Sequence, residues 1–512
     1  MAPELIKHRL GGWLPQDHTV LERWLTKKID QLESQTSPAE FVPVIKELQE
    51  FIEGDESMKY LFKQMFSQVP HKPPYSKDPT KKSQVRHTEP NPISQNVLTR
   101  SDLTQVRDYL TMLKLLNVFL TEAPEFGEEC LVGFPISAIL DWPMGTPAGF
   151  AAFYHPGVNV KFRNVLNEWA KFLSSPASCY VLTDGPGGWF SRAAREAMGD
   201  FDGDFISDPT KPHRGFSSWD DFFTRRFKPG RRPVPELHDP HIRVVISPCE
   251  ATVYDVVSDV QAHDLFWLKA RTYSLSDMLA DHPYTPQFVG GTVYQAHLSA
   301  TDYHRWHAPV DGTVVDLQVI PGTYFSESPA VGMDPCALKG SQGYLAEVAT
   351  RALIFIQADS SLGLMCFMAV GMSEVSTCEI TVEKGSKVAR GDEIGMFHFG
   401  GSTSCLVFRP ETKIHFSDSV KIGNKIKLNE AIGFVDDGQQ SHSTHGHGQP
   451  PRPPFDHRVP GFPSHPRAPI FPFDSHGPSD PHAPELSSDH HGPRFPVEHE
   501  HAPFYHPGPF HR

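Results

Sequence analysis

A serine that directly follows two glycines has the most specific chemistry of any residue pattern in this chain. Ser402 follows Gly400 and Gly401 near the end of the segment 390–403, which reads RGDEIGMFHFGGST. Because glycine has no Cβ, the backbone there can bend until Ser402 Oγ reaches the carbonyl carbon of Gly401. Attack gives an N-to-O acyl shift to an ester, β-elimination then cuts the chain, and loss of ammonia leaves a ketone. Ser402 would thereby become a pyruvoyl group at a new amino terminus.

The tetrapeptide GGST alone is also typical of an ordinary loop between two strands. Its context is more specific, because four stretches resemble motifs of the phosphatidylserine decarboxylase family and occur in the same order. They are residues 221–230 (DFFTRRFKPG), 247–251 (SPCEA), 301–309 (TDYHRWHAP) and 397–403 (FHFGGST). In that family the Gly-Ser bond breaks itself and the serine becomes the pyruvoyl cofactor. The resemblance implies cleavage between Gly401 and Ser402, and a decarboxylase that forms a Schiff base with its substrate without pyridoxal phosphate.

The same resemblance implies roles for four further residues. Histidine is the side chain whose neutral form is abundant near pH 7, and His307 corresponds to the family's base for self-cleavage. Glu250 would orient His307 as a carboxylate orients the histidine of a serine-protease triad. The family usually has Asp at that position, and the longer side chain could leave the orienting role to Asp302. His304 would supply the proton to the former α-carbon during turnover.

The substrate prediction rests on resemblance over residues 10–435 to a soluble mushroom branch of the family, which includes an L-tryptophan decarboxylase. It implies decarboxylation of an aromatic L-amino acid, with L-tryptophan converted to tryptamine and CO2. Trp306, His398 and Phe399 lie within the motifs and are candidate substrate contacts. Aromatic residues at such positions are equally typical of core packing.

Three other functions stay open from the sequence. The first is a phosphatidylserine decarboxylase that forms phosphatidylethanolamine. The second, of another class, is an unprocessed carrier-like binding scaffold, because residues 309–312 and 384–392 are similar to biotinyl and lipoyl carriers. The third is a hydrolase that uses Ser402 with His307, although Ser402 lies outside any Gly-x-Ser-x-Gly elbow.

Composition argues against several classes of partner. The 512 residues carry a formal net charge of -14, which disfavours nucleic-acid binding and adsorption to anionic membranes. No stretch approaches the roughly 20 apolar residues of a membrane span, and residues 1–8 lack the apolar segment of a secretory signal. Seven cysteines without a CxxC pair argue against a disulfide framework and a zinc site. We therefore expect a cytoplasmic protein with no stable membrane insertion and no bound metal.

Hydrophobic periodicity predicts an α+β fold in three parts. Apolar residues at helical spacing predict an α-helical region over residues 1–205, interrupted by a Pro- and Lys-rich loop at 70–94. Short β-branched runs between turns predict a mostly antiparallel catalytic domain over 206–436, packed against the helices. Residues 437–512 are rich in His and Pro and are predicted to be a disordered tail. The two chains produced by cleavage are expected to stay associated.

Overall fold

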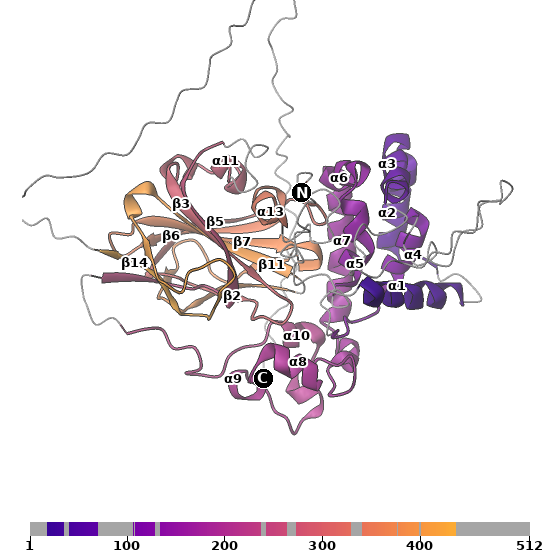
Figure 1. The fold of residues 1–512 in the computed structure, drawn as a ribbon, viewed down its shortest axis with the longest axis horizontal. Coiled ribbons are helices and arrows are strands. Elements are labelled where there is room, and N and C mark those ends of the chain that lie inside the picture. Colours follow the sequence, from indigo (N-terminus) through magenta and orange to yellow (C-terminus); the bar gives the residue numbers. More distant parts are fainter. Residues whose placement is uncertain are drawn as a thin grey trace, which may run out of the picture. The chain divides into compact units, whose positions relative to one another are not determined.

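Helices occupy the first part of the chain and most strands lie in the second, as the computed structural model shows (Figure 1). The structure describes residues 18–34, 40–69, 106, 108–127, 134–236, 242–263, 273–328, 340–375, 377–398 and 401–436. The predicted loop at 70–94 and the predicted tail at 437–512 lie outside the described residues. The α+β class predicted from the sequence is confirmed.

Several of the longer helices begin after a residue whose side chain accepts a hydrogen bond from a free backbone N–H of the first turn. Asp55 accepts a hydrogen bond from Met58 N, and Asp108 accepts one from Thr111 N. Three other helices, α5 to α7, have a proline in their first turn, where its missing N–H is no loss. The α-helices before the first strand are α1 (His18–Glu33), α2 (Pro43–Gly54), α3 (Glu56–Ser67), α4 (Tyr109–Phe119), α5 (Pro135–Met144), α6 (Pro147–Tyr154), α7 (Pro156–Leu173), α8 (Arg192–Met198), α9 (Phe201–Asp204) and α10 (Trp219–Phe223).

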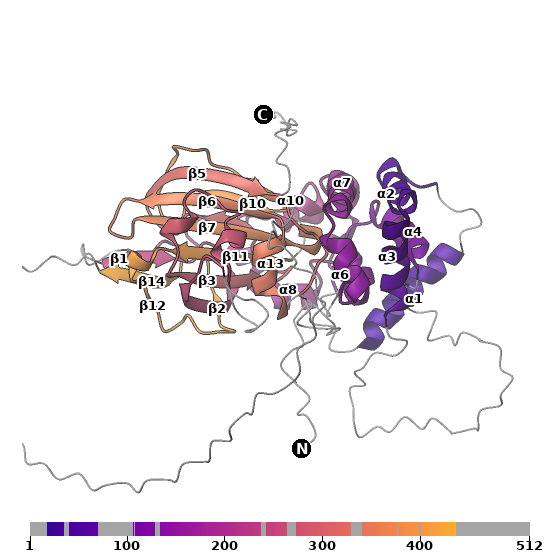
Figure 2. The same cartoon turned by 90° about the horizontal axis from the view of Figure 1, so that it is seen from above.

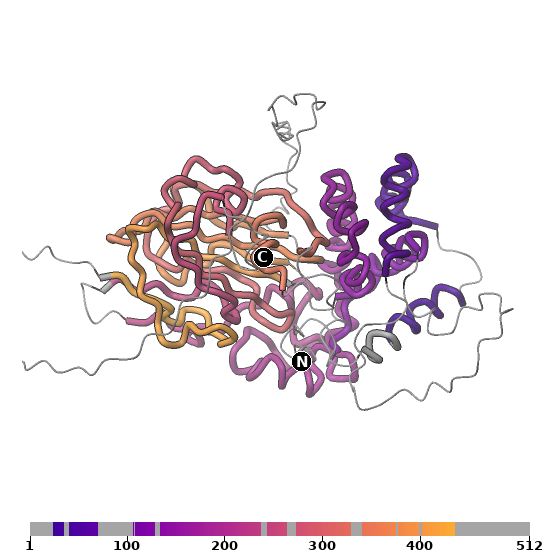
Figure 3. The backbone as a smooth tube through the Cα atoms, turned by 45° about the horizontal axis from the view of Figure 1, so that its top comes forward, coloured from indigo at the N-terminus to yellow at the C-terminus, as the bar shows by residue number. Residues whose placement is uncertain are grey.

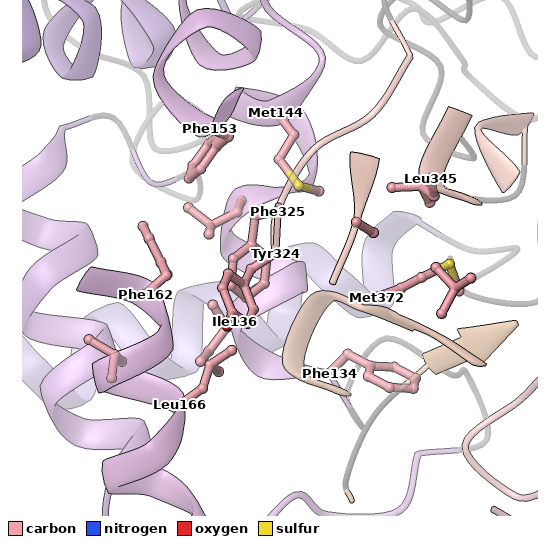
Figure 4. Packing of buried hydrophobic residues seen from close by; sticks show 14 of the residues in the cluster. Phe134, Ile136, Met144, Phe153, Phe162, Leu166, Tyr324, Phe325, Leu345 and Met372 are labelled. Atoms are coloured by element: carbon pink, nitrogen blue, oxygen red, sulfur yellow. The ribbon is translucent and has the colours of Figure 1, made fainter. Parts of the chain in front are cut away.

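The helices and the sheets share one hydrophobic core. Phe162 of α7 lies 5.2 Å from Phe325, ring centroid to ring centroid, and 5.7 Å from Phe153 of α6 (Figure 4). The Asn159 side chain of α7 accepts a hydrogen bond from Tyr324 N at 3.1 Å. These contacts join the helical region to the segment that follows the fifth strand, and both belong to one compact unit within residues 1–440.

The main sheet has eight antiparallel strands in the order β13-β2-β3-β11-β7-β6-β5-β9. Two sheets of three strands, β1-β14-β12 and β4-β10-β8, complete the strand-rich part (Figure 2). The strands are β1 (Ile242–Ile246), β2 (Ala251–Val260), β3 (Gly291–Leu298), β4 (Arg305–His307), β5 (Gly312–Ile320), β6 (Arg351–Ala358), β7 (Leu364–Met372), β8 (Cys378–Ile380), β9 (Lys387–Val388), β10 (Glu393–Phe397), β11 (Gly401–Phe408), β12 (His415–Phe416), β13 (Lys425–Ile426) and β14 (Ala431–Asp436). Two short helices, α11 (Leu275–Met278) and α13 (Gln342–Val348), lie between strands.

The adjacent strands β7 and β11 lie in the interior, and β11 begins at the predicted cleavage site. Every residue of β7 is buried. The adjacent β11 begins at Gly401 and alternates its side chains between two core clusters, with Val407 in one and Leu406 in the other. In the tube view of Figure 3 the indigo and purple helical segments and the orange strands occupy separate regions of this unit.

The small sheet β4-β10-β8 brings the histidine motif beside the segment that precedes Ser402. In its register Trp306 of β4 pairs with Gly395 of β10. A Cβ at Gly395 would lie 2.4 Å from the Trp306 ring, so glycine is required for the close approach. Phe397 N then donates to the His304 carbonyl at 2.9 Å. The two motifs, distant in sequence, are therefore neighbours in the fold.

Candidate active site

The predicted scissile bond lies at the first residues of a central strand. Gly401 pairs with Met372 of β7, and Ser402 lies between Gly371 of β7 and Leu298 of β3. Both neighbouring strands hold the backbone on the carboxyl side of the bond. The register of Ser402 is thus fixed before any cleavage takes place.

The Ser402 hydroxyl is fully buried and has no hydrogen-bond partner among the residues that the structure describes. By strand alternation it lies on the face of Leu406, in the core cluster that also contains Trp306 and Phe397. A buried hydroxyl without a partner costs about 1–3 kcal/mol. The Ser402 hydroxyl therefore contributes no hydrogen bond to the stability of the described part of the fold.

His304 is also fully buried, and neither ring nitrogen forms a hydrogen bond within the described part of the chain. Its ring stacks on Phe223 of α10, with centroids 4.0 Å apart and planes at 25°. Burial, together with the nearby Arg225 guanidinium, holds the pKa of His304 well below its usual range. His304 is therefore a neutral imidazole in an apolar setting.

His307 is held by a hydrogen bond at each ring nitrogen. Nδ1 donates to the Gly391 carbonyl at 2.6 Å, and Nε2 lies 2.9 Å from the Tyr303 hydroxyl. Because a carbonyl can only accept, Nδ1 carries the hydrogen, and burial lowers the pKa of His307 so that the ring is neutral. The lone pair of Nε2 consequently accepts from the Tyr303 hydroxyl. The Gly391 carbonyl and the Tyr303 hydroxyl together fix the orientation of the His307 ring.

The two carboxylates considered for the orienting role have other partners. Glu250 Oε1 accepts from Arg232 Nη2 at 2.9 Å, and Arg232 also bonds Asp204 at 3.0 Å. Burial raises the pKa of Glu250, and the Arg232 charge opposes that shift. Asp302 pairs with Lys425 and accepts from Ser299 N. The hydrogen bonds of these carboxylates thus go to groups other than the two histidines.

Of the three candidate substrate contacts, two are described by the structure. Trp306 is fully buried and packs edge-on against Phe397, with centroids 4.7 Å apart. His398 is bound through both ring nitrogens, Nδ1 to Asp220 at 3.0 Å and Nε2 to Glu379 at 2.8 Å. The third candidate, Phe399, lies outside the described residues, as does Gly400. The structure thus places Trp306 in the core and His398 in an ion cluster.

Glu374 is a buried carboxyl that the sequence motifs did not single out. It follows β7 two residues after Met372, the partner of Gly401, and it is buried. Its two carboxylate oxygens accept from Ser137 N at 2.7 Å and from Ser137 Oγ at 3.0 Å, in the first turn of α5. Burial raises the pKa of Glu374 to about 7 despite these hydrogen bonds. A single acidic residue two positions after an entirely apolar strand was the available signal in the sequence.

The described ranges also bear on two other kinds of site. No group of three or more His, Cys, Asp or Glu side chains in them is arranged to hold a metal ion. None of their helices is long and apolar enough to cross a membrane.

Comparison with known families and proteins places this site in a defined class. A family model for phosphatidylserine decarboxylase matches residues 219–434, and a second model with that description matches residues 42–90 and 89–198. The chain is 45% identical over 322 residues to decarboxylase iboD of Amanita muscaria, which covers 59% of this chain and 91% of that protein. It is 33% identical over 459 residues to the L-tryptophan decarboxylase of Psilocybe cubensis, covering 85% of this chain and 96% of that protein.

A third relative is bacterial. The phosphatidylserine decarboxylase proenzyme of Chlamydia pneumoniae is 30% identical over 225 residues, which are 44% of this chain and 68% of that protein. The class that these matches define is the carboxy-lyases, and this chain is a decarboxylase. More narrowly, the chain belongs to the phosphatidylserine decarboxylase family, whose members depend on a pyruvoyl group. Because the chain belongs to a family of enzymes, the carrier-like binding scaffold is no longer an alternative.

Proposed function

We propose that this protein cleaves itself between Gly401 and Ser402 and then decarboxylates L-tryptophan to tryptamine. The single observation that carries the proposal is the Ser402 hydroxyl, which is fully buried, follows Gly401 directly and has no partner among the described residues. Such a group is costly for stability. It fits a residue that is consumed by chemistry rather than one that stabilises the fold.

The residues around Ser402 fit a pyruvoyl group formed in place. The group would replace the Ser402 side chain and amino group, so it needs no separate binding site, and the strand register of β11 holds it between β3 and β7. Once formed, it supplies an electron-accepting carbonyl for loss of CO2, without pyridoxal phosphate. His307 has the neutral tautomer suited to removing the Ser402 proton, and His304 remains our candidate for protonating the product carbon.

The two cleaved chains should remain together because the strands of the shorter chain are paired with strands of the longer one. After the cut, β11 would still lie between β3 and β7, and β14 would still pair with β1. The ladder of β11 alone runs through Phe408 on both sides. Separating the chains would expose this central strand, whose described side chains are almost all buried.

Support for tryptophan comes from the extent of similarity to the L-tryptophan decarboxylase of Psilocybe cubensis, which is aligned over 96% of its length. The helical part of this chain is included in that alignment, since 459 residues are matched. The L-tryptophan decarboxylase of Psilocybe cyanescens is 38% identical over 341 residues. A small amino-acid substrate is thus the proposal that the whole chain supports best.

Phosphatidylserine is the second candidate, because the model that matches the catalytic part bears that name. The test is to incubate purified, cleaved protein separately with L-tryptophan and with phosphatidylserine in detergent micelles, and to quantify tryptamine and phosphatidylethanolamine. We expect tryptamine and no phosphatidylethanolamine. Phosphatidylethanolamine without tryptamine would overturn the substrate assignment and leave the decarboxylase class intact.

A further inference from the structure

His398 lies three residues before Gly401 and is enclosed by two carboxylates from distant parts of the chain. Its Nδ1 lies 3.0 Å from each carboxylate oxygen of Asp220, and its Nε2 lies 2.8 Å from Glu379 Oε2. A carboxylate can only accept, so both nitrogens must carry hydrogens, which only the imidazolium form provides. The three side chains form an ion cluster, here called the His398 clamp.

The charges of the clamp favour the imidazolium strongly. Burial opposes the charge on His398, but the charges and hydrogen bonds of Asp220 and Glu379 outweigh it and raise the pKa to about 10. The side chain of His398 is 25% exposed, that of Asp220 18% and that of Glu379 49%. Because Glu379 is the more exposed partner and water screens it more, Asp220 is expected to be the stronger partner.

The clamp connects the chain before the scissile bond to α10. Asp220 lies in that helix, and in the same helix Phe223 stacks on His304. Glu379 lies on β8, where it pairs with Met396. One short helix therefore positions both the ring of His304 and the residue that leads into the cleavage segment.

Backbone hydrogen bonds also fix the chain at Phe397 and His398. Phe397 N donates to the His304 carbonyl at 2.9 Å, and His398 N donates to the Thr377 carbonyl at 3.2 Å. Gly401, on the same amino side of the scissile bond, is paired with Met372 of β7. Only residues 399 and 400 lie between the two fixed points, and one of them is glycine.

We propose that His398 is a positioning residue for self-cleavage, and that the His398 clamp fixes the chain on the amino side of the Gly401–Ser402 bond. This inference rests on the proposed function. In the step concerned, Ser402 Oγ bonds to the Gly401 carbonyl carbon while the bond from that carbon to the Ser402 nitrogen breaks. The hydroxyl proton ends on the released amine, so an amide becomes an ester with no other reactant. Holding the chain at His398 and at Gly401 keeps the reacting atoms close.

The role differs from the substrate contact that the sequence suggested. Both ring nitrogens are already used by carboxylates, so neither is left to meet an indole or a substrate carboxylate. The clamp should therefore affect the rate at which the uncut chain matures. It should leave the KM for the amino acid unchanged once the chain is cut.

The test compares Asp220→Asn, Glu379→Gln, His398→Gln and His398→Lys with the wild-type chain. Freshly synthesised uncut protein is followed over time by gel for conversion to two chains, and the thermal unfolding midpoint is measured for each variant. We expect Asp220→Asn and His398→Gln to slow cleavage by about 10- to 100-fold, and Glu379→Gln to slow it less. His398→Lys keeps the positive charge and should recover part of the rate. Glu168→Gln, which removes only the exposed pair with Lys171, is the control and should cleave normally.

The pH dependence of the cleavage rate distinguishes a positioning role of Asp220 from a loss of stability. Asp220 and Glu379 are the charged groups that face His398 among the described residues, from α10 and β8. Without Asp220 the pKa of His398 should fall toward its ordinary value of about 6.5. The cleavage rate of Asp220→Asn relative to wild type should then decline between about pH 6 and pH 9. A ratio that does not change with pH would mean that Asp220 serves only stability, and the inference would be abandoned.

Two further results are decisive. Wild-type cleavage rates in Asp220→Asn and His398→Gln, with Ser402→Ala uncut, would sink the inference and leave the proposed function standing. A raised KM for tryptophan with an unchanged cleavage rate would make His398 a substrate contact instead. If Ser402→Ala itself were cut and active, the proposed function would fail first. Should Asp220→Asn not fold, His398→Lys against His398→Gln still tests the charge.

Discussion

Arg232 donates from Nη2 to Glu250 Oε1 at 2.9 Å, so the carboxylate predicted to orient a catalytic histidine is bound by a guanidinium. The side chains are only 14% and 11% exposed, and the pair therefore lies in a setting where a lost partner leaves a poorly solvated charge. In the same structure the Gly391 carbonyl holds Nδ1 of His307 at 2.6 Å. The Gly391 carbonyl thus orients His307, which is the role that the sequence resemblance assigned to the carboxylate of Glu250.

The Arg232 to Glu250 pair is expected to stabilise the fold rather than to orient His307. Glu250→Gln and Arg232→Gln should each lower stability by about 1–3 kcal/mol, and the double variant should cost less than their sum. Asp204 also binds Arg232, which limits the loss in Glu250→Gln. Thermal unfolding and cleavage rates of all four proteins measure this. A cleavage defect in Glu250→Gln that Arg232→Gln does not share would restore the orienting role.

Ser402→Ala should leave the chain uncut and without decarboxylase activity, because no other atom can supply the nucleophile. Its stability should match or exceed that of the wild-type precursor by up to about 1 kcal/mol, since the lost hydroxyl is buried and has no partner among the described residues. Ser404→Ala is the matched control on the same strand face and should cleave. Intact-mass measurement of each purified protein gives the result. Normal decarboxylation by Ser402→Ala would refute the assignment of the cofactor.

His307→Ala should slow self-cleavage by about 100-fold or more, as expected for loss of a general base. Tyr303→Phe removes only the hydroxyl that occupies Nε2, so its cleavage rate should stay within about threefold of wild type. His304→Ala should still cleave at least in part but lose turnover. Gel analysis of maturation and a tryptamine assay of the cleaved protein distinguish the three. Blocked maturation in His304→Ala with normal maturation in His307→Ala would mean that the two histidines exchange duties.

Glu374 should make stability depend on pH. Its pKa is raised from an ordinary value of 4.5 to about 7 in the folded chain, so folding favours the protonated form. The contribution is fully present below about pH 4.5 and is lost as pH rises through about 7, by roughly 3 kcal/mol in total. Glu374→Gln in the Ser402→Ala background should remove this dependence.

The measurement for Glu374 is the thermal unfolding midpoint at several pH values between about 5 and 8. The midpoint of Glu374→Gln relative to its parent should rise with pH, because only the parent bears the cost of ionising a buried carboxyl. Glu411→Gln, at an exposed position, is the control and should follow the parent throughout. Parallel curves for Glu374→Gln and the parent would show that Glu374 does not titrate in this range.

The sequence by itself determined the fold class and the family, and it predicted the position of the chemistry. Apolar residues at helical spacing predicted the helical region that contains α7, and short β-branched runs between turns predicted the strands of the second part. Such patterns are local, since a helix or a strand repeats every few residues along the chain. The pair Gly401 and Ser402 is likewise local, because in the proposed self-cleavage the serine attacks its own neighbour.

Only the tertiary structure decided which groups surround these residues. The partners of the ion and hydrogen-bond clusters are far apart in sequence: His398 and Asp220 are separated by 178 positions, and Glu374 and Ser137 by 237. No periodicity links such positions, because strand order and the packing of helices on the sheet bring them together. Their protonation states follow from burial and from the charge of the partner, and these exist only once the chain has folded.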